Sequence, residues 1–256
     1  MTSKTYTVTA INIKSINYGE ADKIITVFTK EDGILKVIAK GVRRISSKFG
    51  ARIDLLHCNR LFLTKGKNLD VMSQAETHVH FPAFRKDYDK LMQALYWAEL
   101  IYVFCNEGEA LPEIFDLFLN SLDILQKGTQ MPLLYTLWFE LKLLEHIGYS
   151  CNFTHCVSCE RVITREIENF YFDLTSGGIL CPSCQVLFKN IKPITRELYL
   201  TLRKLKQFSS NDISSVSINE KVEKNIECIQ DFYQTYVCYL AEKKLKTISF
   251  LEDSKI

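Results

Sequence analysis

The sequence predicts an α+β protein of more than one domain. We expect a five-stranded OB-fold β-barrel over residues 1–80, then a helical domain over residues 81–256 with an inserted four-cysteine zinc finger at about 151–190. Three observations predict this fold class. Apolar residues recur with a period of two up to about residue 77, and with a period near 3.6 from Pro82 onward. Two C-x2-C pairs then interrupt the helical pattern.

Strands separated by turn signals account for the first 77 residues. The predicted strands cover residues 6–16, 24–29, 34–39, 53–64 and 69–74. The first contains a change of phase that a β-bulge would absorb. Asp32-Gly33 supplies the positive φ that a tight hairpin needs, and Lys65–Asn68 forms a second turn. A small closed barrel is the natural way to bury five such strands. An OB-fold is the commonest solution, although an SH3-like barrel has a similar number of strands.

Amphipathic helices account for most of the remaining chain. They are predicted at residues 91–105, 112–128, 133–148, 194–208 and 216–245. Pro112 fits the first turn of its helix, where a missing N–H costs nothing, and Gly128 and Gly148 are typical helix ends. No low-complexity linker separates the strands from the helices, so we expect the two domains to pack closely.

The composition excludes several classes of protein. The content of glycine and proline is too low for a collagen-like or low-complexity chain. The first residues contain no apolar signal segment, and no run approaches the length of a membrane span. We therefore expect a cytosolic protein with no membrane partner. An odd count of nine cysteines in such a chain indicates reduced thiols and raises the question of a metal.

The two cysteine pairs predict a structural zinc site. Cys156-x2-Cys159 and Cys181-x2-Cys184 are separated by 21 residues, in which Phe170–Phe172 can form a hairpin. Four thiolates suit the tetrahedral preference of zinc. They also fill the coordination sphere, so we expect one structural zinc ion per chain and no catalysis by the metal.

Other signals of chemistry are weak. We interpret the remaining cysteines as core residues, with Cys151 a minor contender as a ligand; they are Cys58, Cys105, Cys151, Cys228 and Cys238. His78-Val79-His80 has no visible third ligand and is interpreted as a surface strand end. No nucleophile elbow, Walker A loop or dinucleotide fingerprint is present, so no catalytic residue and no small-molecule substrate are predicted.

The net charge of +2 conceals a polarised chain. Residues 1–80 have a net charge of +6, residues 81–150 of −5 and residues 151–256 of +1. Between Lys36 and Lys67 there are nine basic residues and a single acid, Asp54. A basic barrel beside an acidic helical stretch indicates a polyanionic partner for the barrel.

The segment 40–50 is a basic loop that also bears hydroxyl groups. Arginine forks and serine hydroxyls suit phosphate oxygens, and Phe49, Phe62 or Tyr18 could stack on bases, although we interpret the two phenylalanines as core residues rather than stacking platforms. An isolated charge run is often only a solvated loop. On a small barrel we interpret it as a surface that binds DNA, with contacts from Lys36, Lys40, Arg43, Arg44, Lys48, Arg52, Lys65 and Lys67.

Several short motifs follow one another along the chain. They are Tyr18–Asp22, Ala39–Arg44, Ser47–Ala51, Gln74–Glu76, Leu144–Tyr149 and Gly177–Cys181 together with both cysteine pairs. In this order, they resemble the motifs of the RecO family of bacterial DNA repair proteins. The resemblance spans about residues 5–188, and beyond Lys189 only generic helices are recognised.

The resemblance implies a function for the chain. A RecO has an amino-terminal OB-fold, a helical domain and an inserted zinc finger. It is a non-enzymatic recombination mediator of the bacterial cytoplasm, associated with the nucleoid, that binds single- and double-stranded DNA and anneals complementary strands. Its partners are RecR and the acidic tail of single-strand DNA-binding protein, and through them it helps to load RecA. The sequence does not mark the pocket for that tail.

Two alternatives from other classes stay open on the residues alone. An RNA-binding or translation-associated module would use an OB barrel and a four-cysteine finger equally well. A zinc hydrolase or transferase would need an open position on the metal, which four thiolates do not leave.

Overall fold

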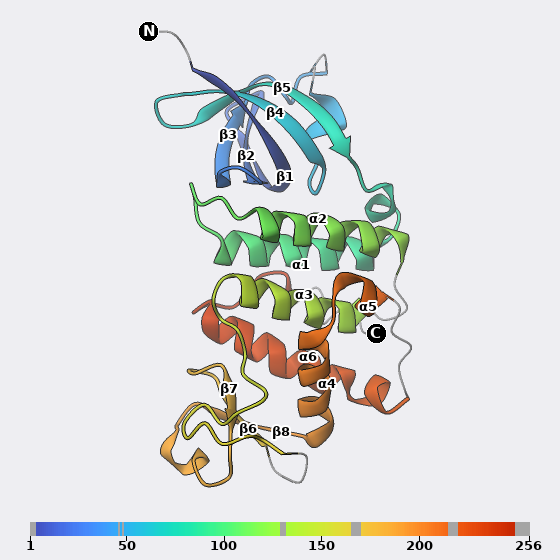
Figure 1. Cartoon of the computed structure of the whole chain (residues 1–256). Coiled ribbons are helices and arrows are strands. Elements are labelled where there is room, and N and C mark those ends of the chain that lie inside the picture. Colours follow the sequence, from blue (N-terminus) through green and yellow to red (C-terminus); the bar gives the residue numbers. More distant parts are fainter. Residues whose placement is uncertain are drawn as a thin grey trace. The chain divides into compact units, whose positions relative to one another are not determined.

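The computed structural model describes residues 4–45, 47, 49–128, 132–164, 170–214 and 220–248 (Figure 1). The chain forms two compact units. The first comprises Met1–Gly128 and Leu245–Ile256, and the second comprises Thr129–Lys244. The first two helices, which end before Gly128, therefore belong to the same compact unit as the strands of the barrel. The domain boundary that the sequence predicts near residue 80 marks the change from strands to helices and stays a prediction.

Five strands form a closed barrel in the first unit (Figure 1). They are β1 (Thr5–Tyr18), β2 (Asp22–Thr29), β3 (Gly33–Ala39), β4 (Cys58–Thr64) and β5 (Asp70–Val79). The closed order is β1-β2-β3-β5-β4, in which β1 pairs antiparallel with β4 and β3 pairs parallel with β5. This Greek-key closure is that of an OB-type barrel and resolves the choice between the two predicted barrels.

Inward-facing residues of every strand fill the barrel. Val8, Ile25, Val37, Leu61 and Met72 are each at most 2% exposed and belong to one apolar cluster. The predicted bulge in the first strand is confirmed, because the pairing of β1 with β2 shifts register between Asn12 and Lys14. The bulge allows one 14-residue strand to curl from one side of the barrel to the other.

The predicted strand over 53–64 is wrong in its first five residues. The chain forms a 3-10 turn at Gly50–Ile53, and Leu56 has a positive φ of 68° before β4 starts at Cys58. Ile53 is therefore not paired in the sheet, but its side chain packs into the barrel core. An apolar run indicates burial, but here the burial comes from a turn that closes one end of the barrel.

Helices α1 (Tyr88–Phe104) and α2 (Pro112–Lys127) follow the barrel after a 3-10 turn, η2 (Pro82–Arg85). The Asp87 side chain caps α1 by accepting from the N–H of Lys90, and Pro112 opens α2 as predicted. The α1–α2 connection bonds to the β2–β3 hairpin: Ile34 N–H donates to the carbonyl of Asn106 at 3.1 Å. The helices are thus attached to the barrel by backbone hydrogen bonds.

Gly33 is the most constrained point of this attachment. Its φ is +63°, and a Cβ built there would lie 2.2 Å from the carbonyl oxygen of Glu109. Gly33→Ala should therefore lower the free energy of unfolding by about 3 kcal/mol, measured by chemical denaturation. Gly19→Ala is the matched control, because Gly19 has a similar φ of +55° in open space. Equal losses in the two variants would show that the close approach costs nothing.

The second unit is helical with a small sheet. Its elements are α3 (Pro132–His146), β6 (Phe170–Asp173), β7 (Gly178–Leu180), β8 (Ile191–Ile194), α4 (Arg196–Gln207), α5 (Ser210–Ser214) and α6 (Glu220–Leu240). The predicted hairpin after Phe170 is confirmed as β6–β7, and β8 was not predicted. Ile194 closes β8, so α4 starts two residues later than predicted. The predicted start of the last helix, residues 216–219, lies outside the described residues.

Aromatic side chains attach the sheet to the helices of this unit. Phe170 stacks on Tyr199 of α4 with ring centroids 4.3 Å apart, and Phe172 meets Phe232 and Tyr236 of α6 edge-on at 5.2 and 5.1 Å. Within the described ranges, no helix has both the length and the apolar character needed to span a membrane.

Candidate nucleic-acid interface and zinc site

The basic loop, residues 40–49 after β3, is anchored on the β1–β2 turn. Gly41 N–H donates to Asp22 Oδ1 at 2.7 Å, Arg43 N–H donates to the carbonyl of Ala21 at 2.9 Å, and the Arg43 guanidinium reaches the carbonyl of Gly19 at 3.3 Å. Gly41 has a φ of +66°, which a residue with a Cβ adopts only at a cost. The start of the loop, at Gly41 and Arg43, is therefore fixed to the β1–β2 turn.

The basic loop, the β1–β2 turn and the β4–β5 turn border the same side of the barrel. The parallel pairing of β3 with β5 brings the β4–β5 turn, which contains Lys65 and Lys67, beside β3. OB-folds bind oligonucleotides on the face of strands 2 and 3, between the loops that join strands 1 to 2 and strands 4 to 5. The predicted contacts on β3 and in these loops thus surround the face that an OB-fold uses.

Four of the predicted DNA contacts are exposed cations with no acidic partner among the described residues. They are Lys40, Arg43, Arg44 and Lys67. The side chain of Ile45, between the arginines and the serines, is also fully exposed. A phosphate could approach these cations without displacing a carboxylate.

Lys36 and Lys65 differ, because each already has a carboxylate partner. Lys36 pairs with Glu107 of the α1–α2 connection, and the hydrogen bond from this pair raises the pKa of Lys36. Lys65 pairs with Asp70 at 2.9 Å. Burial tends to raise the pKa of Asp70, but hydrogen bonds from Tyr6 and Lys65 lower it below its usual value. Charge counting along the chain missed both partners.

Two further DNA contacts are predicted in this segment, Lys48 and Arg52. Arg52 is exposed on the turn that ends the basic loop, and its N–H donates to the carbonyl of Phe49 at 3.0 Å. Lys48 lies outside the described residues.

Among the aromatic candidates, Phe49 packs against the barrel core, whereas Tyr18 is 52% exposed beside the turn that anchors the loop. Tyr18 is therefore the better placed of these two for base stacking.

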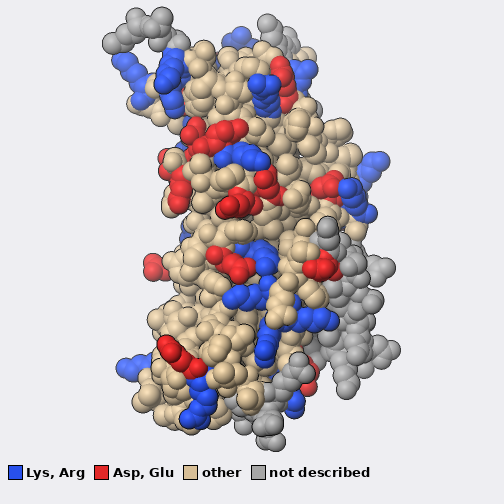
Figure 2. All heavy atoms as spheres, viewed as in Figure 1, with Lys and Arg blue, Asp and Glu red and all other residues tan. Residues whose placement is uncertain are grey.

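Acidic residues gather elsewhere in the same unit. Figure 2 shows red side chains on the side where the α1–α2 connection lies in Figure 1. The exposed acids of that region are Glu107, Glu109, Glu113 and Asp116. Asp54, the single acid between Lys36 and Lys67, is paired with Arg85. The acids of the α1–α2 connection therefore repel a polyanion from their own part of the unit.

The four predicted zinc ligands are brought together. The Sγ atoms of Cys156, Cys159, Cys181 and Cys184 all lie within 4.8 Å of one another. Sγ of Cys159 and Sγ of Cys181 are 3.8 Å apart. A tetrahedral ion with Zn–S bonds of about 2.3 Å requires sulfur atoms about 3.8 Å apart, so the donor set fits zinc in chemistry and in size.

Backbone N–H groups around Cys156 favour the thiolate form of its side chain. The N–H of Cys181 donates to Sγ of Cys156 at 3.4 Å. Burial opposes ionisation, but backbone hydrogen bonds from Cys181, Cys159 and Ser158 lower the pKa of Cys156 to about 6. The thiolate is the form that binds a metal, so this sulfur is prepared as a ligand.

The other metal candidates do not join this cluster. Among the described residues, the four cysteines form the only group of three or more ligand side chains close enough for one ion. Cys151, the minor contender, is buried with its Sγ 3.6 Å from Oη of Tyr233. His80 follows the end of β5 at Val79, which agrees with its interpretation as a strand end.

Both halves of the chain match models of a known protein family. Residues 1–81 match the family model described as Recombination protein O N terminal, and residues 85–247 match Recombination protein O C terminal. The two models meet close to the change from strands to helices. The second model alone covers more than half of the chain.

Relatives match over nearly their whole length. A DNA repair protein RecO of Dehalococcoides mccartyi is 28% identical over 247 residues, which cover 96% of this chain and 95% of the relative. The DNA repair protein RecO of Desulforamulus reducens is 30% identical over 249 residues, 97% of this chain and 94% of the relative. That of Acetivibrio thermocellus is 28% identical over 242 residues, 94% of each. With its closed barrel, its helices and its cluster of four cysteines, the chain belongs to the RecO family of DNA repair proteins.

Proposed function

We propose that this protein is a non-enzymatic recombination mediator of the bacterial cytoplasm that acts on nucleoid DNA. It binds single- and double-stranded DNA, anneals complementary strands and, with RecR, helps to load RecA onto DNA coated by single-strand DNA-binding protein. Membership of the RecO family supports the DNA repair role. The partners are part of this proposal.

A single observation carries the DNA-binding part of the proposal. Arg43 and Arg44 are exposed cations without acidic partners in the described part of the chain, on a loop that the β1–β2 turn holds beside the OB-fold binding face. Arginine guanidinium groups form forked hydrogen bonds with phosphate oxygens. Such contacts release counterions and are largely independent of sequence, so the binding should weaken steeply with salt.

Annealing follows from the same surface. Two DNA strands repel each other, and a basic surface that contacts both can offset the repulsion through counterion release. No covalent bond is made or broken, so the step needs no catalytic group. Exposed Tyr18 could hold a base unstacked while a complementary strand is sampled.

The cysteine cluster holds one structural zinc ion in this proposal. Zinc bound by four thiolates supplies no open coordination position and acts only by cross-linking the chain. The residues that would hold it are Cys156, Cys159, Cys181 and Cys184. Their knuckles connect the 152–157 segment with β7, where Val157 N–H donates to the carbonyl of Ile179 at 2.9 Å.

An annealing and binding assay across a range of salt concentrations tests the function. The full-length protein should anneal complementary oligonucleotides without nucleotide, and a RecR-type partner should alter the rate. Matched DNA and RNA oligonucleotides then compete for the protein. A strong preference for RNA would favour a translation-associated module over the mediator.

The eight predicted contacts should not contribute equally. Lys36→Ala should change the affinity for single-stranded DNA by less than about twofold, because the lysine is already neutralised by Glu107. Lys40→Ala removes the same side chain from a position with no acidic partner among the described residues, and it should weaken binding and lower the salt slope by about 0.7. Fluorescence anisotropy with a labelled oligonucleotide measures both. A larger effect from Lys36 than from Lys40 would contradict this ranking.

A further inference from the structure

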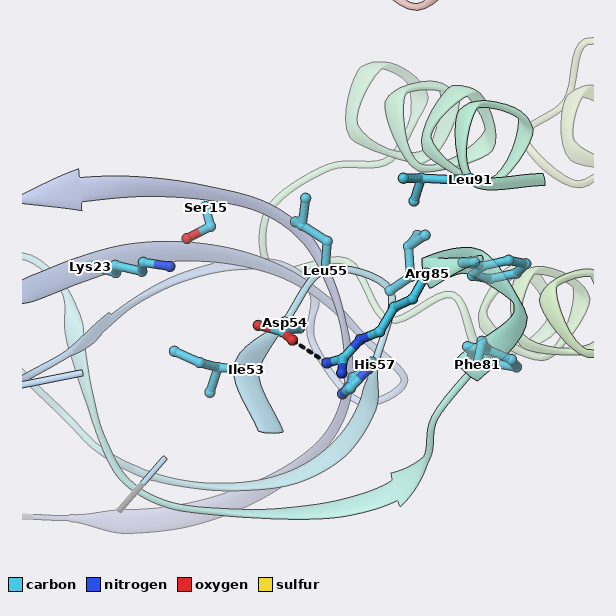
Figure 3. A pocket seen from close by; sticks show the side chains of 11 residues that line it. Ser15, Lys23, Ile53, Asp54, Leu55, His57, Phe81, Arg85 and Leu91 are labelled. Atoms are coloured by element: carbon cyan, nitrogen blue, oxygen red, sulfur yellow. Dashed lines mark hydrogen bonds and ion pairs between the residues drawn. The ribbon is translucent and has the colours of Figure 1, made fainter. Parts of the chain in front are cut away.

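A pocket of about 570 Å³ opens at one end of the barrel, entirely within the first unit (Figure 3). We call it the mouth pocket. Ile53, Leu56, Phe81 and Phe84, all nearly buried, form an apolar floor. A volume of this size with an apolar floor and a few polar groups is typical of a ligand site.

The polar groups of the mouth pocket come from different elements. Lys23 of β2 and Arg85 of η2 reach toward the pocket from opposite sides, and Arg85 is paired with Asp54 at 2.5 Å (Figure 3). Lys23 stands in the same row of β2 as Ile25 and therefore extends the inward-facing row at the barrel end. Within the described part of the chain, its Nζ has no hydrogen-bond or ion-pair partner, so a cation faces an open apolar space.

Two buried polar atoms in the lining also lack partners. Oγ of Ser15 and Nδ1 of His57 are inaccessible, and neither forms a hydrogen bond with a described residue. Buried polar groups are nearly always satisfied, so such atoms need a water molecule or a ligand. Burial lowers the pKa of His57, although the nearby Asp54 carboxylate opposes the shift. The lining thus combines an ammonium group with two enclosed polar atoms whose hydrogen-bonding capacity is unused among the described residues.

Both ends of the basic loop are connected to residues that line this pocket. At its start, the loop bonds to Asp22, the neighbour of Lys23, and Lys23 itself pairs in register with Ala39. At its end, the chain passes through the turn at Gly50–Ile53 directly into the lining residues Ile53 and Asp54. A strand bound along the loop therefore passes close to Lys23 at the start of the loop and to Ile53 and Asp54 beyond its end.

We propose that the mouth pocket receives one nucleotide of single-stranded DNA that is bound by the basic loop, with the base on the apolar floor and its phosphate at Lys23. The inference rests on the proposed DNA binding and assigns a new contact to it. Charge complementarity favours a nucleotide over an apolar peptide, because the unpartnered charge in the lining is positive. Holding a base out of the stack would also leave its strand ready to pair.

The first arm of the test removes the charge. Lys23→Met keeps the length of the side chain, and it should weaken the binding of a (dT)20 oligonucleotide about fivefold and lower the salt slope by about 0.7. Lys86→Met is the matched control, since Lys86 is exposed close to Arg85 but does not line the pocket. The affinity of the control should stay within about twofold of the wild type. Equal affinities of both variants and wild type would overturn the proposal.

The second arm tests the base. Ser15→Leu fills the pocket without changing the charge, and binding is compared between (dT)20 and an abasic strand of equal length. For each protein, the ratio of its affinity for (dT)20 to its affinity for the abasic strand measures the contribution of the bases. This ratio should be roughly tenfold larger for the wild type than for Ser15→Leu. If Ser15→Leu lowers the melting temperature, Leu55→Gln replaces it, because Leu55 is already 39% exposed at the rim and the change removes an apolar contact without changing the charge. Equal losses of affinity in the wild type and the variant would show that no base binds in the pocket.

Two outcomes separate the pocket from the function on which it depends. If the wild-type protein does not bind (dT)20, the proposed function itself fails. If the wild type binds and Lys23→Met matches it, only the pocket assignment fails. Thymidine monophosphate at the oligonucleotide concentration should not compete, because it lacks the phosphates that the loop contacts. Full competition would identify a mononucleotide site and overturn the assignment to a DNA strand.

Discussion

Reversing both charges in Arg43→Glu combined with Arg44→Glu should lower the affinity for single-stranded DNA roughly a hundredfold at low salt. The two guanidinium groups are exposed and have no acidic partner among the described residues, so the wild type can use both for phosphate. Two glutamates at the same place would repel the strand. Annealing should fall in parallel, because it depends on the same contacts. Anisotropy titrations across salt and an annealing time course measure the two effects.

A matched control distinguishes the position of the charges from their number. Lys243→Glu combined with Lys244→Glu changes the net charge equally, at an exposed adjacent pair in the second unit. This control should bind DNA within about threefold of the wild type, because contacts, not total charge, determine affinity. Equal losses in the two double variants would mean that the basic loop is not the interface. Unchanged melting temperatures would show that neither variant acts by unfolding.

The barrel could be predicted because each local signal agreed with the global fold. Alternation of apolar residues marked the strands, and Asp32-Gly33 marked the hairpin between β2 and β3. The pairing order could not be predicted, since an OB-fold and an SH3-like barrel differ in contacts between distant strands. Only the pairings of β1 with β4 and of β3 with β5 distinguish them.

The misassigned residues 53–57 show a limit of periodicity. Ile53 and Leu56 are buried as an apolar run suggests, but they are buried by a turn that closes the barrel. Hydrophobicity reports burial and not backbone conformation, and the positive φ of Leu56 leaves no mark in the sequence. The same turn forms the floor of the mouth pocket, which is why the sequence alone did not reveal that pocket.

The cysteine cluster could be predicted from the sequence, but the availability of the basic residues could not. The spacing of the cysteines is local, and their clustering is confirmed. A bound zinc ion stays a prediction. The charge of the barrel was counted along the chain, which cannot reveal that Lys36 meets Glu107, 71 residues later. Long-range ion pairs decide which basic residues are available, and they follow from the fold.

Loss of zinc should destabilise the second unit more than any other change considered. Cys156→Ser should reduce the zinc content from one ion per chain to nearly none, and should lower the free energy of unfolding of this unit by at least about 3 kcal/mol. The knuckles hold the β6–β7 hairpin, whose Phe172 packs against Phe232 and Tyr236 of α6. Without the metal cross-link, this aromatic contact loses the support that fixes the hairpin. Metal analysis and denaturant unfolding measure the two effects.

Cys151→Ser tests whether the effect comes from the metal and not from the loss of a buried thiol. Cys151 is as buried as Cys156, but its Sγ contacts Oη of Tyr233 and lies outside the cluster. This variant should therefore keep one zinc ion per chain and lose much less stability. Because the basic loop belongs to the first unit, both variants should retain most of the wild-type DNA affinity. A wild-type protein that is purified without zinc, and that is no more stable than Cys156→Ser, would contradict the structural role of the ion.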